Sequence, residues 1–211
     1  MKEVFKNLYQ FTEYIEQIQL TIHQYLFLGE HPFLVGTGRV QHTKEILPKI
    51  KKILGEKKLS YLLVSHMESD ECGGISVLKE EYPDLTVISS EMTAREMDGF
   101  GYKGKIISKR GGETLKEKCY ELQFIDYPSE VHLRNGIVFF EKQNRIFFSS
   151  DLMLRRGDGR GKVMQGCWQE EIEKIQRDRV CDKDLLYQLK EDLKQFVPQF
   201  IAVGHGFCLQ V

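Results

Sequence analysis

A cluster of potential metal ligands directly follows a short apolar run, and it restricts the folds open to this chain more than any other feature. The run LSYLLVS, residues 59–65, predicts a buried strand, and HMESDE begins where that strand ends. Within HMESDE, His66, Glu68 and Asp70 stand at alternating positions. Acidic residues in a loop are usually only solvated, so the cluster gains its meaning from ligand-type residues elsewhere in the chain.

Further ligand-type residues follow other apolar runs. Asp151 comes after RIFFSS, His205 comes after FIAVG, and His132 lies between them and the first cluster. Carboxylates and imidazoles together form a hard oxygen and nitrogen environment that suits divalent metal ions. Because six such side chains exceed what one ion needs, the sequence predicts a site for two metal ions.

The remaining pattern predicts a layered α/β chain. Residues 21–38 predict a hairpin around a turn at 29–32, and apolar residues at helical spacing predict a helix that ends at Gly55, with Thr43 as a candidate cap. The other predicted elements are helices over 74–82, 91–98, 169–177 and 183–196, strands over 85–89 and 200–203, and a hairpin of 136–141 with 145–149. This order predicts two packed half-domains within one domain, residues 1–211.

Composition excludes several classes of partner. Lys and Arg number 30 against 31 Asp and Glu, so neither nucleic acid nor an anionic membrane is expected as the main partner. The first 20 residues mix charge into every apolar stretch, which predicts no signal peptide, no spanning helix and a cytoplasmic protein. Five cysteines without a CxxC pair predict free thiols, and Cys72 is expected to be a bystander near the metal cluster.

In these residues the sequence resembles the metallo-β-lactamase superfamily, and within it the diiron domain of flavodiiron proteins. The superfamily loop motif is His-x-His-x-Asp-His, and flavodiiron proteins carry at its third position a glutamate, which is Glu68 here. His132 in YPSEVHLRNGIVFF, Asp151 in RIFFSSDLM and His205 in AVGHG match the later positions, and the resemblance spans roughly residues 20 to 207. It implies an α/β fold of the αββα sandwich type, in four α+β layers.

The resemblance also implies a ligand set. One metal would be bound by His66, Glu68 and His132, the other by Asp70 and His205, and Asp151 would bridge the two. A glutamate in place of a loop imidazole favours iron or manganese over zinc, so two iron ions are expected, with zinc and manganese as alternatives. No flavin is expected to bind this chain, because no flavodoxin domain follows the metal domain.

Two positions depart from the superfamily pattern. Glu71 stands where the family has a histidine, and its carboxylate could ligate the second metal, bind a water on that metal, or swing out and leave the position to solvent. If it stays ionised, its charge favours the oxidised metal pair and lowers the reduction potential. Gly36-Thr37-Gly38 lies where the superfamily often has Asp-Thr-Gly, and a plain turn is expected there.

The function implied is a diiron protein that binds or reduces O2 or NO. It would take electrons from an external flavoprotein or a rubredoxin-like donor, or act as an oxygen-binding sensor, and it could form a homodimer. The alternative is a zinc-type hydrolase of the same superfamily, in which a bridging hydroxide attacks a thioester, ester or phosphodiester. A third class is a binding or scaffold protein with a degenerate site.

Other features are expected to be structural. The histidines outside the ligand pattern are expected to be surface or satisfied core residues, and they are His23, His31 and His42. Residues 155–162 (RRGDGRGK) are expected to form a flexible solvated loop rather than a flap over the metals. The aromatic pairs of the predicted hairpin are expected to be core, namely Phe139, Phe140, Phe147 and Phe148.

Overall fold

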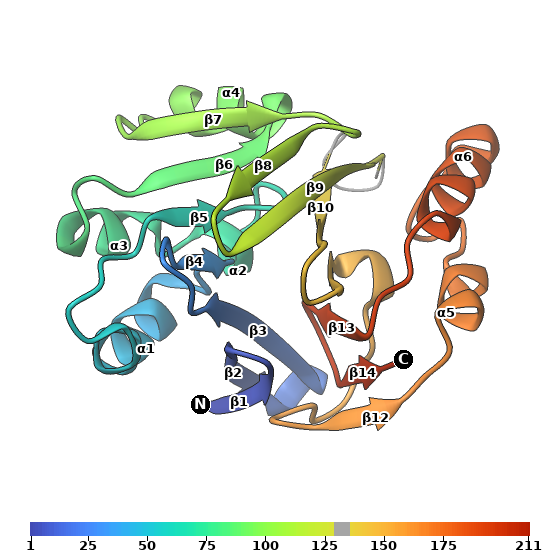
Figure 1. The fold of residues 1–211 in the computed structure, drawn as a ribbon, viewed down its shortest axis with the longest axis horizontal. Helices are drawn as coiled ribbons and strands as arrows, with labels where there is room; N and C mark the ends of the chain where they lie inside the picture. The colour runs from blue at the N-terminus through green and yellow to red at the C-terminus, as the bar shows by residue number, and fades with distance from the viewer. Residues whose placement is uncertain (129–135) are drawn as a thin grey trace.

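Two β-sheets form the centre of the fold (Figure 1). The computed structural model describes residues 1–128 and 136–211. Within these residues each sheet has seven strands, in the orders β1-β2-β3-β4-β5-β6-β7 and β12-β14-β13-β11-β10-β9-β8. The first sheet consists of β1 (Lys2–Phe5), β2 (Leu8–Ile15), β3 (Leu20–Phe27), β4 (Phe33–Val35), β5 (Tyr61–Leu63), β6 (Thr86–Ser90) and β7 (Lys105–Lys109). The second consists of β8 (Thr114–Glu117), β9 (Tyr120–Tyr127), β10 (Gly136–Glu141), β11 (Ile146–Ser150), β12 (Val163–Gln165), β13 (Phe200–Val203) and β14 (Cys208–Gln210).

Helices cover the outer face of each sheet, which gives four layers in the order α, β, β, α (Figure 1). The first sheet carries α1 (Val40–Leu54), α2 (Ser69–Cys72), α3 (Ile75–Glu81) and α4 (Glu91–Gly99), and the second carries α5 (Trp168–Lys174) and α6 (Lys183–Lys194). Short 3-10 turns are η1 (Glu16–Ile18) and η2 (Asp151–Met153). In the described part of the chain no helix has the length and apolar character that crossing a membrane requires.

Aromatic side chains join the two sheets at the centre of the sandwich. The ring of Phe148 on β11 meets Phe33 on β4 edge to face, with ring centroids 5.9 Å apart, and meets Tyr25 on β3 at 6.1 Å. All three side chains are almost fully buried. Because buried aromatic pairs of this geometry add to the free energy gained from burying their area, they stabilise the face-to-face packing of the sheets.

The predicted fold class is confirmed, and so are the main elements of the sequence analysis. β3 pairs antiparallel with β4, and β10 pairs antiparallel with β11, as both predicted hairpins require. One detail was wrong: α1 begins at Val40, and the Thr43 hydroxyl, instead of capping the helix, donates to the backbone oxygens of Thr37 and Arg39. The strands β1, β2, β12 and β14 were not predicted.

Parallel strands in each sheet bring the predicted ligands to one place. β5 runs parallel to β4 and β6, and β11 runs parallel to β13. His66 follows β5, while Asp151 and His205 follow β11 and β13. The carboxyl ends of parallel strands lie at the same edge of a sheet, where ligands commonly bind in α/β folds. The two edges are joined by backbone hydrogen bonds from Ile137 N to Ser65 O and from His23 N to Gly204 O.

Candidate metal centre

The loop after β5 supplies the first group of ligand-type side chains. Glu68 precedes the short helix α2, and Asp70 lies within it. Backbone hydrogen bonds from Thr37 N to Glu71 O, at 2.8 Å, and from Gly38 N to Asp70 O, at 2.9 Å, hold this helix. The expectation of a plain turn at Gly36-Thr37-Gly38 was therefore wrong, because its N–H groups anchor the ligand loop.

Asp151 and His205 approach from the second sheet. Asp151 opens η2 directly after β11, and the residue before it, Ser150, has φ 45°. A positive φ is uncommon for a residue with a side chain, and here it lets the strand turn sharply. The His205 ring is oriented by its Nδ1, which donates to the backbone oxygen of Thr21 at 2.8 Å. Its Nε2 is then left to face the centre.

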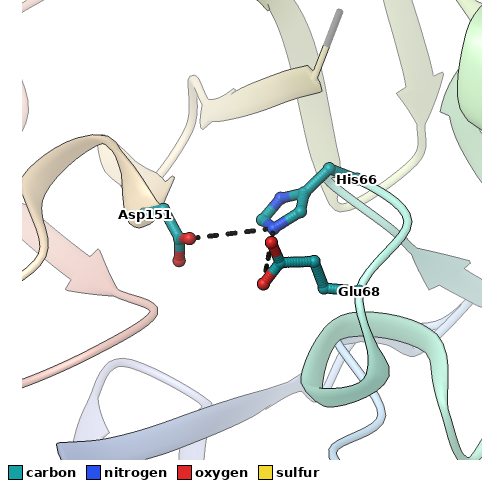
Figure 2. A group of neighbouring side chains, drawn as sticks. All are labelled: His66, Glu68 and Asp151. Carbon is teal, nitrogen blue, oxygen red and sulfur yellow. Dashed lines mark ion pairs between the residues drawn. The ribbon is translucent and has the colours of Figure 1, made fainter. Parts of the chain in front are cut away.

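The structure brings five of the six predicted ligands together. His66 Nε2 lies 3.7 Å from Glu68 Oε2 and 3.7 Å from Asp151 Oδ2, as Figure 2 shows. On the other side, His205 Nε2 lies 2.9 Å from Asp151 Oδ1 and 3.6 Å from Asp70 Oδ2. Asp151 thus presents one oxygen to each histidine. The sixth predicted ligand, His132, lies outside the described residues.

The charges of the neighbouring groups in the cluster shift one another's pKa values. Burial by itself lowers the pKa of His66, but the hydrogen bond with Glu68 and the nearby carboxylates outweigh it and raise the pKa to about 9. The pKa of His205 is also raised, because Asp151 and Asp70 outweigh its burial. Burial raises the pKa of Asp70, and the charges of the other carboxylates add to this. Without metal, protonated imidazoles balance the carboxylates.

The same residues fit a metal pair. Asp151 Oδ1 is buried and has no hydrogen-bond partner among the described residues, since its close approach to His205 Nε2 lacks hydrogen-bond geometry. A buried carboxylate oxygen without a partner is costly, and a cation between it and the imidazole would satisfy both. The ligand atoms of His66, Glu68 and Asp151 all lie within 4.8 Å of one another. The donors are oxygen and imidazole nitrogen, which suits iron, manganese or zinc.

Glu71 is buried beside the cluster. Its Oε1 accepts a hydrogen bond of 2.9 Å from Ser150 Oγ, and burial raises its pKa above the usual value. Its Oε2 points toward the other departure from the superfamily pattern, because a Cβ added at Gly36 would lie 3.6 Å from it. The two unusual positions, Gly36 and Glu71, are therefore neighbours in space.

Cys72 lies outside this set of ligand atoms. Its Sγ donates to the backbone oxygen of Glu68 at 3.2 Å, and burial raises the pKa of the thiol to about 12. A thiol held in this state is neither a ready thiolate ligand nor a reactive nucleophile.

The other histidines differ in their surroundings. His31 is exposed, and His23 is buried with both ring nitrogens in contact with polar atoms, as expected. His42 was expected to be at the surface or satisfied, but it is buried and its Nε2 has no hydrogen-bond partner among the described residues. Sequence reasoning missed the support that His23 gives to the His205 turn through its contact with Gly206 O.

Residues 155–162 do not form the solvated loop that was expected. Gly157 N donates to Gln19 O, and Gly161 N donates to the side chain of Gln10, so the loop is bonded to the first sheet. Arg155 pairs with buried Glu171, and its backbone N–H donates to His205 O. The glycine-rich sequence indicated mobility, but its glycines instead permit close contact, since a Cβ at Gly159 would lie 1.8 Å from the oxygen of Gly206.

Comparison with known proteins agrees with this geometry. Rubredoxin-oxygen oxidoreductase of Megalodesulfovibrio gigas is 25% identical over 134 residues, which cover 63% of this chain and 33% of that protein. Nitric oxide reductase of Moorella thermoacetica is 34% identical over 71 residues, which cover 34% of this chain and 18% of that protein. The chain spans between about a fifth and a third of the length of these curated relatives.

A solved structure matches almost the whole chain. The metal-soaked Flv1 flavodiiron core from Synechocystis sp. PCC6803 superimposes with a TM-score of 0.77 at 17% identity, over 96% of this chain and 54% of that one. Residues 20–206 match the family model described as "ODP family beta lactamase". With its αββα sandwich and flavodiiron relatives, the chain belongs to this metallo-β-lactamase family.

Proposed function

We propose that this chain binds two iron ions and uses them to bind or reduce O2 or NO. The observation that carries the proposal is the position of Asp151, whose two carboxylate oxygens face two different buried histidines, His66 and His205. A carboxylate in this position can bridge two cations. The names of the relatives, an oxygen oxidoreductase and a nitric oxide reductase, support the choice of ligand.

The chain would hold the two ions with different residues. The ligand set proposed for one ion is His66, Glu68 and His132, and for the other it is Asp70 and His205, with Asp151 shared. When bound, two ferrous ions would supply open coordination positions for a diatomic molecule and two electrons for its reduction. The protein orients the imidazoles: Thr21 O fixes the ring of His205, and the hydroxyl of Ser65, 3.2 Å from His66 Nδ1, supports the other ring.

Electrons would come from outside this domain. The relative from Megalodesulfovibrio gigas is named for rubredoxin, so a rubredoxin-like protein or a flavoprotein is the proposed donor. Without sustained donation the same site would act as a sensor of O2 or NO. We propose residues 1–211 as one domain, because the two sheets share a single aromatic core.

Metal content gives the first test. Protein produced without oxygen in iron-supplied cells should contain about two iron ions per chain by elemental analysis, and Asp151→Ala should lower occupancy at both positions. Asp98→Ala, which removes an exposed carboxylate on α4, is the matched control and should leave the content unchanged. About one iron per chain, unchanged by Asp151→Ala, would refute the bridging role.

Reactivity gives the second test. Reduced protein mixed with O2 or NO in an anaerobic stopped-flow instrument should react once per metal pair and then stop. A reductase should resume turnover in an oxygen electrode when a rubredoxin-like donor is added, whereas a sensor should bind without sustained consumption. The proposal fails if neither gas changes the absorbance of the iron-loaded protein, and catalytic cleavage of model esters by the zinc-loaded protein would instead support a hydrolase.

A further inference from the structure

One oxygen of the Glu71 carboxylate is hydrogen-bonded outside the cluster of ligand atoms. Oε1 accepts the hydrogen bond from Ser150 Oγ, whereas Oε2 is buried without a hydrogen-bond partner among the described residues and would lie 3.6 Å from a Cβ added at Gly36. Among the described residues, Glu68, Asp70 and Asp151 each place a carboxylate oxygen within 3.7 Å of the Nε2 of His66 or His205, and Glu71 does not. The backbone of Glu71 is also held in place, because its backbone carbonyl oxygen accepts a hydrogen bond from Thr37 N.

Ser150 connects Glu71 to two of the proposed ligands. Its hydroxyl lies 3.5 Å from His66 Nδ1, and its backbone leads directly into Asp151. Because Ser150 donates its only hydroxyl proton to Glu71, its oxygen can only accept from His66 Nδ1–H, together with Ser65 Oγ, which lies 3.2 Å from the same nitrogen. That arrangement leaves Nε2, the atom facing Glu68 and Asp151, free to bind a cation.

Ser150 also has a conformation that needs support. Its φ of 45° and ψ of −132° lie outside the regions that residues with side chains normally occupy. Such a conformation persists only where surrounding contacts hold it, and here the backbone bond from Gly204 N to Ser150 O acts together with the buried hydrogen bond to Glu71. The contact with Glu71 therefore contributes to the direction in which Asp151 leaves the strand.

We propose that Glu71 is a positioning residue rather than a metal ligand: by holding Ser150 it orients the imidazole of His66 and presents Asp151 to both metals. This inference rests on the proposed two-metal centre. A hydrogen-bonded carboxylate behind a metal-bound histidine is a common means of fixing the ring and raising its affinity for the metal.

Substitutions at the two partners distinguish positioning from ligation. Ser150→Ala and Glu71→Leu each break the hydrogen bond, and each should weaken iron binding by about 10- to 100-fold, the usual effect of losing such a contact. Glu71→Gln keeps an oxygen that can accept from Ser150, so it should weaken binding clearly less than Glu71→Leu. Ser89→Ala is the matched control, because it removes a buried hydroxyl on β6 that donates to the backbone oxygen of Ser90 and does not contact Ser150.

The readouts are metal affinity by competition with a chelator and occupancy of each position in crystals of iron-loaded protein. Positioning predicts that Glu71→Leu and Ser150→Ala lower occupancy at both positions. Ligation predicts loss at the Asp70 and His205 position alone and normal binding by Ser150→Ala. Either of these results would overturn the proposal.

A metal-free measurement separates this inference from the proposed function. In chelator-treated protein, Glu71→Leu and Ser150→Ala should each lower the thermal midpoint, and the double variant should fall little further than the lower single variant, because both remove one contact. Additive shifts would refute the link even if iron binds as proposed. If the wild-type chain binds fewer than two metals, the two-metal function is refuted. The role of Glu71 toward both metals is then refuted as well, whatever the thermal midpoints show.

Discussion

His23 should make a contribution to the stability of this protein that is lost between neutral and mildly acidic pH. This residue is 6% exposed on β3, and its Nε2 donates to the backbone oxygen of Gly206, which can only accept. Its Nδ1 lies 2.8 Å from the hydroxyl of Thr12. A neutral imidazole satisfies both contacts, with the proton on Nε2. Burial lowers the pKa of His23 from 6.5 to about 4.

The sign of the effect follows from proton binding. Below pH 6.5 the unfolded chain binds a proton at His23 that the folded chain does not bind until about pH 4, so unfolding is favoured as the pH falls through this window. One pKa unit corresponds to about 1.4 kcal/mol, which sets the full effect at about 3 kcal/mol. Between pH 7.5 and pH 5, the folded protein should lose about 2 kcal/mol through this residue.

Urea unfolding at these two pH values tests the reasoning. His23→Gln keeps an amide that can donate to Gly206 O but cannot titrate, so acidification should lower the free energy of unfolding of the wild type by about 2 kcal/mol relative to that of the variant. Both proteins are compared with chelator present, so that metal release contributes to neither, and the raised pKa values of His66 and His205 contribute equally to both. The same pH-dependent change in the two proteins would refute the claim that His23 is buried in its neutral form.

Three further outcomes are expected. Thr37→Val should lower the free energy of unfolding by about 1 kcal/mol in denaturant titrations, because Gly74 N–H loses the Thr37 hydroxyl and keeps only Gly38 O as acceptor; an unchanged midpoint would contradict this. Arg155→Met should cost about 3–5 kcal/mol by leaving buried Glu171 with only Lys174, and adding Glu171→Met should recover most of the loss by the same assay. Removing metal with a chelator should lower the thermal midpoint, and restoring iron should raise it, unless the site binds no metal.

The sequence was sufficient for elements whose own residues carry a strong pattern. β5 is a short apolar run, and the hairpin of β10 and β11 has buried aromatic residues on both sides of a polar turn. The strands that were missed depend on partners. All three residues of β12 are exposed, and its extended form depends on parallel pairing with β14, while β1 carries Lys2 and Glu3 and pairs with β2. Pairing between distant segments leaves no periodic signal in either one.

The candidate site divides in the same way. The sequence alone identified His66, Glu68 and Asp151 as candidate ligands at strand ends, because side chains of these types are unusual after apolar runs. The contacts that hold these side chains in place could not be predicted, since Thr37 and Gly38 anchor the ligand loop through backbone N–H groups, which every residue except proline possesses. The positive φ of Ser150 could not be predicted either, because serine has no preference for that conformation.

The closeness of Gly36 and Glu71 constrains how this site can change by single mutations. An aspartate at position 36 tolerates the φ of 66° better than most residues, but it would bring a second buried carboxylate close to Glu71. A histidine at position 71 alone would leave Ser150 without its acceptor and position 36 without a carboxylate. Each of these single substitutions is therefore disfavoured. The double substitution Gly36→Asp with Glu71→His removes the carboxylate at position 71 and supplies one at position 36. Descendants of this chain should therefore keep both residues or replace both.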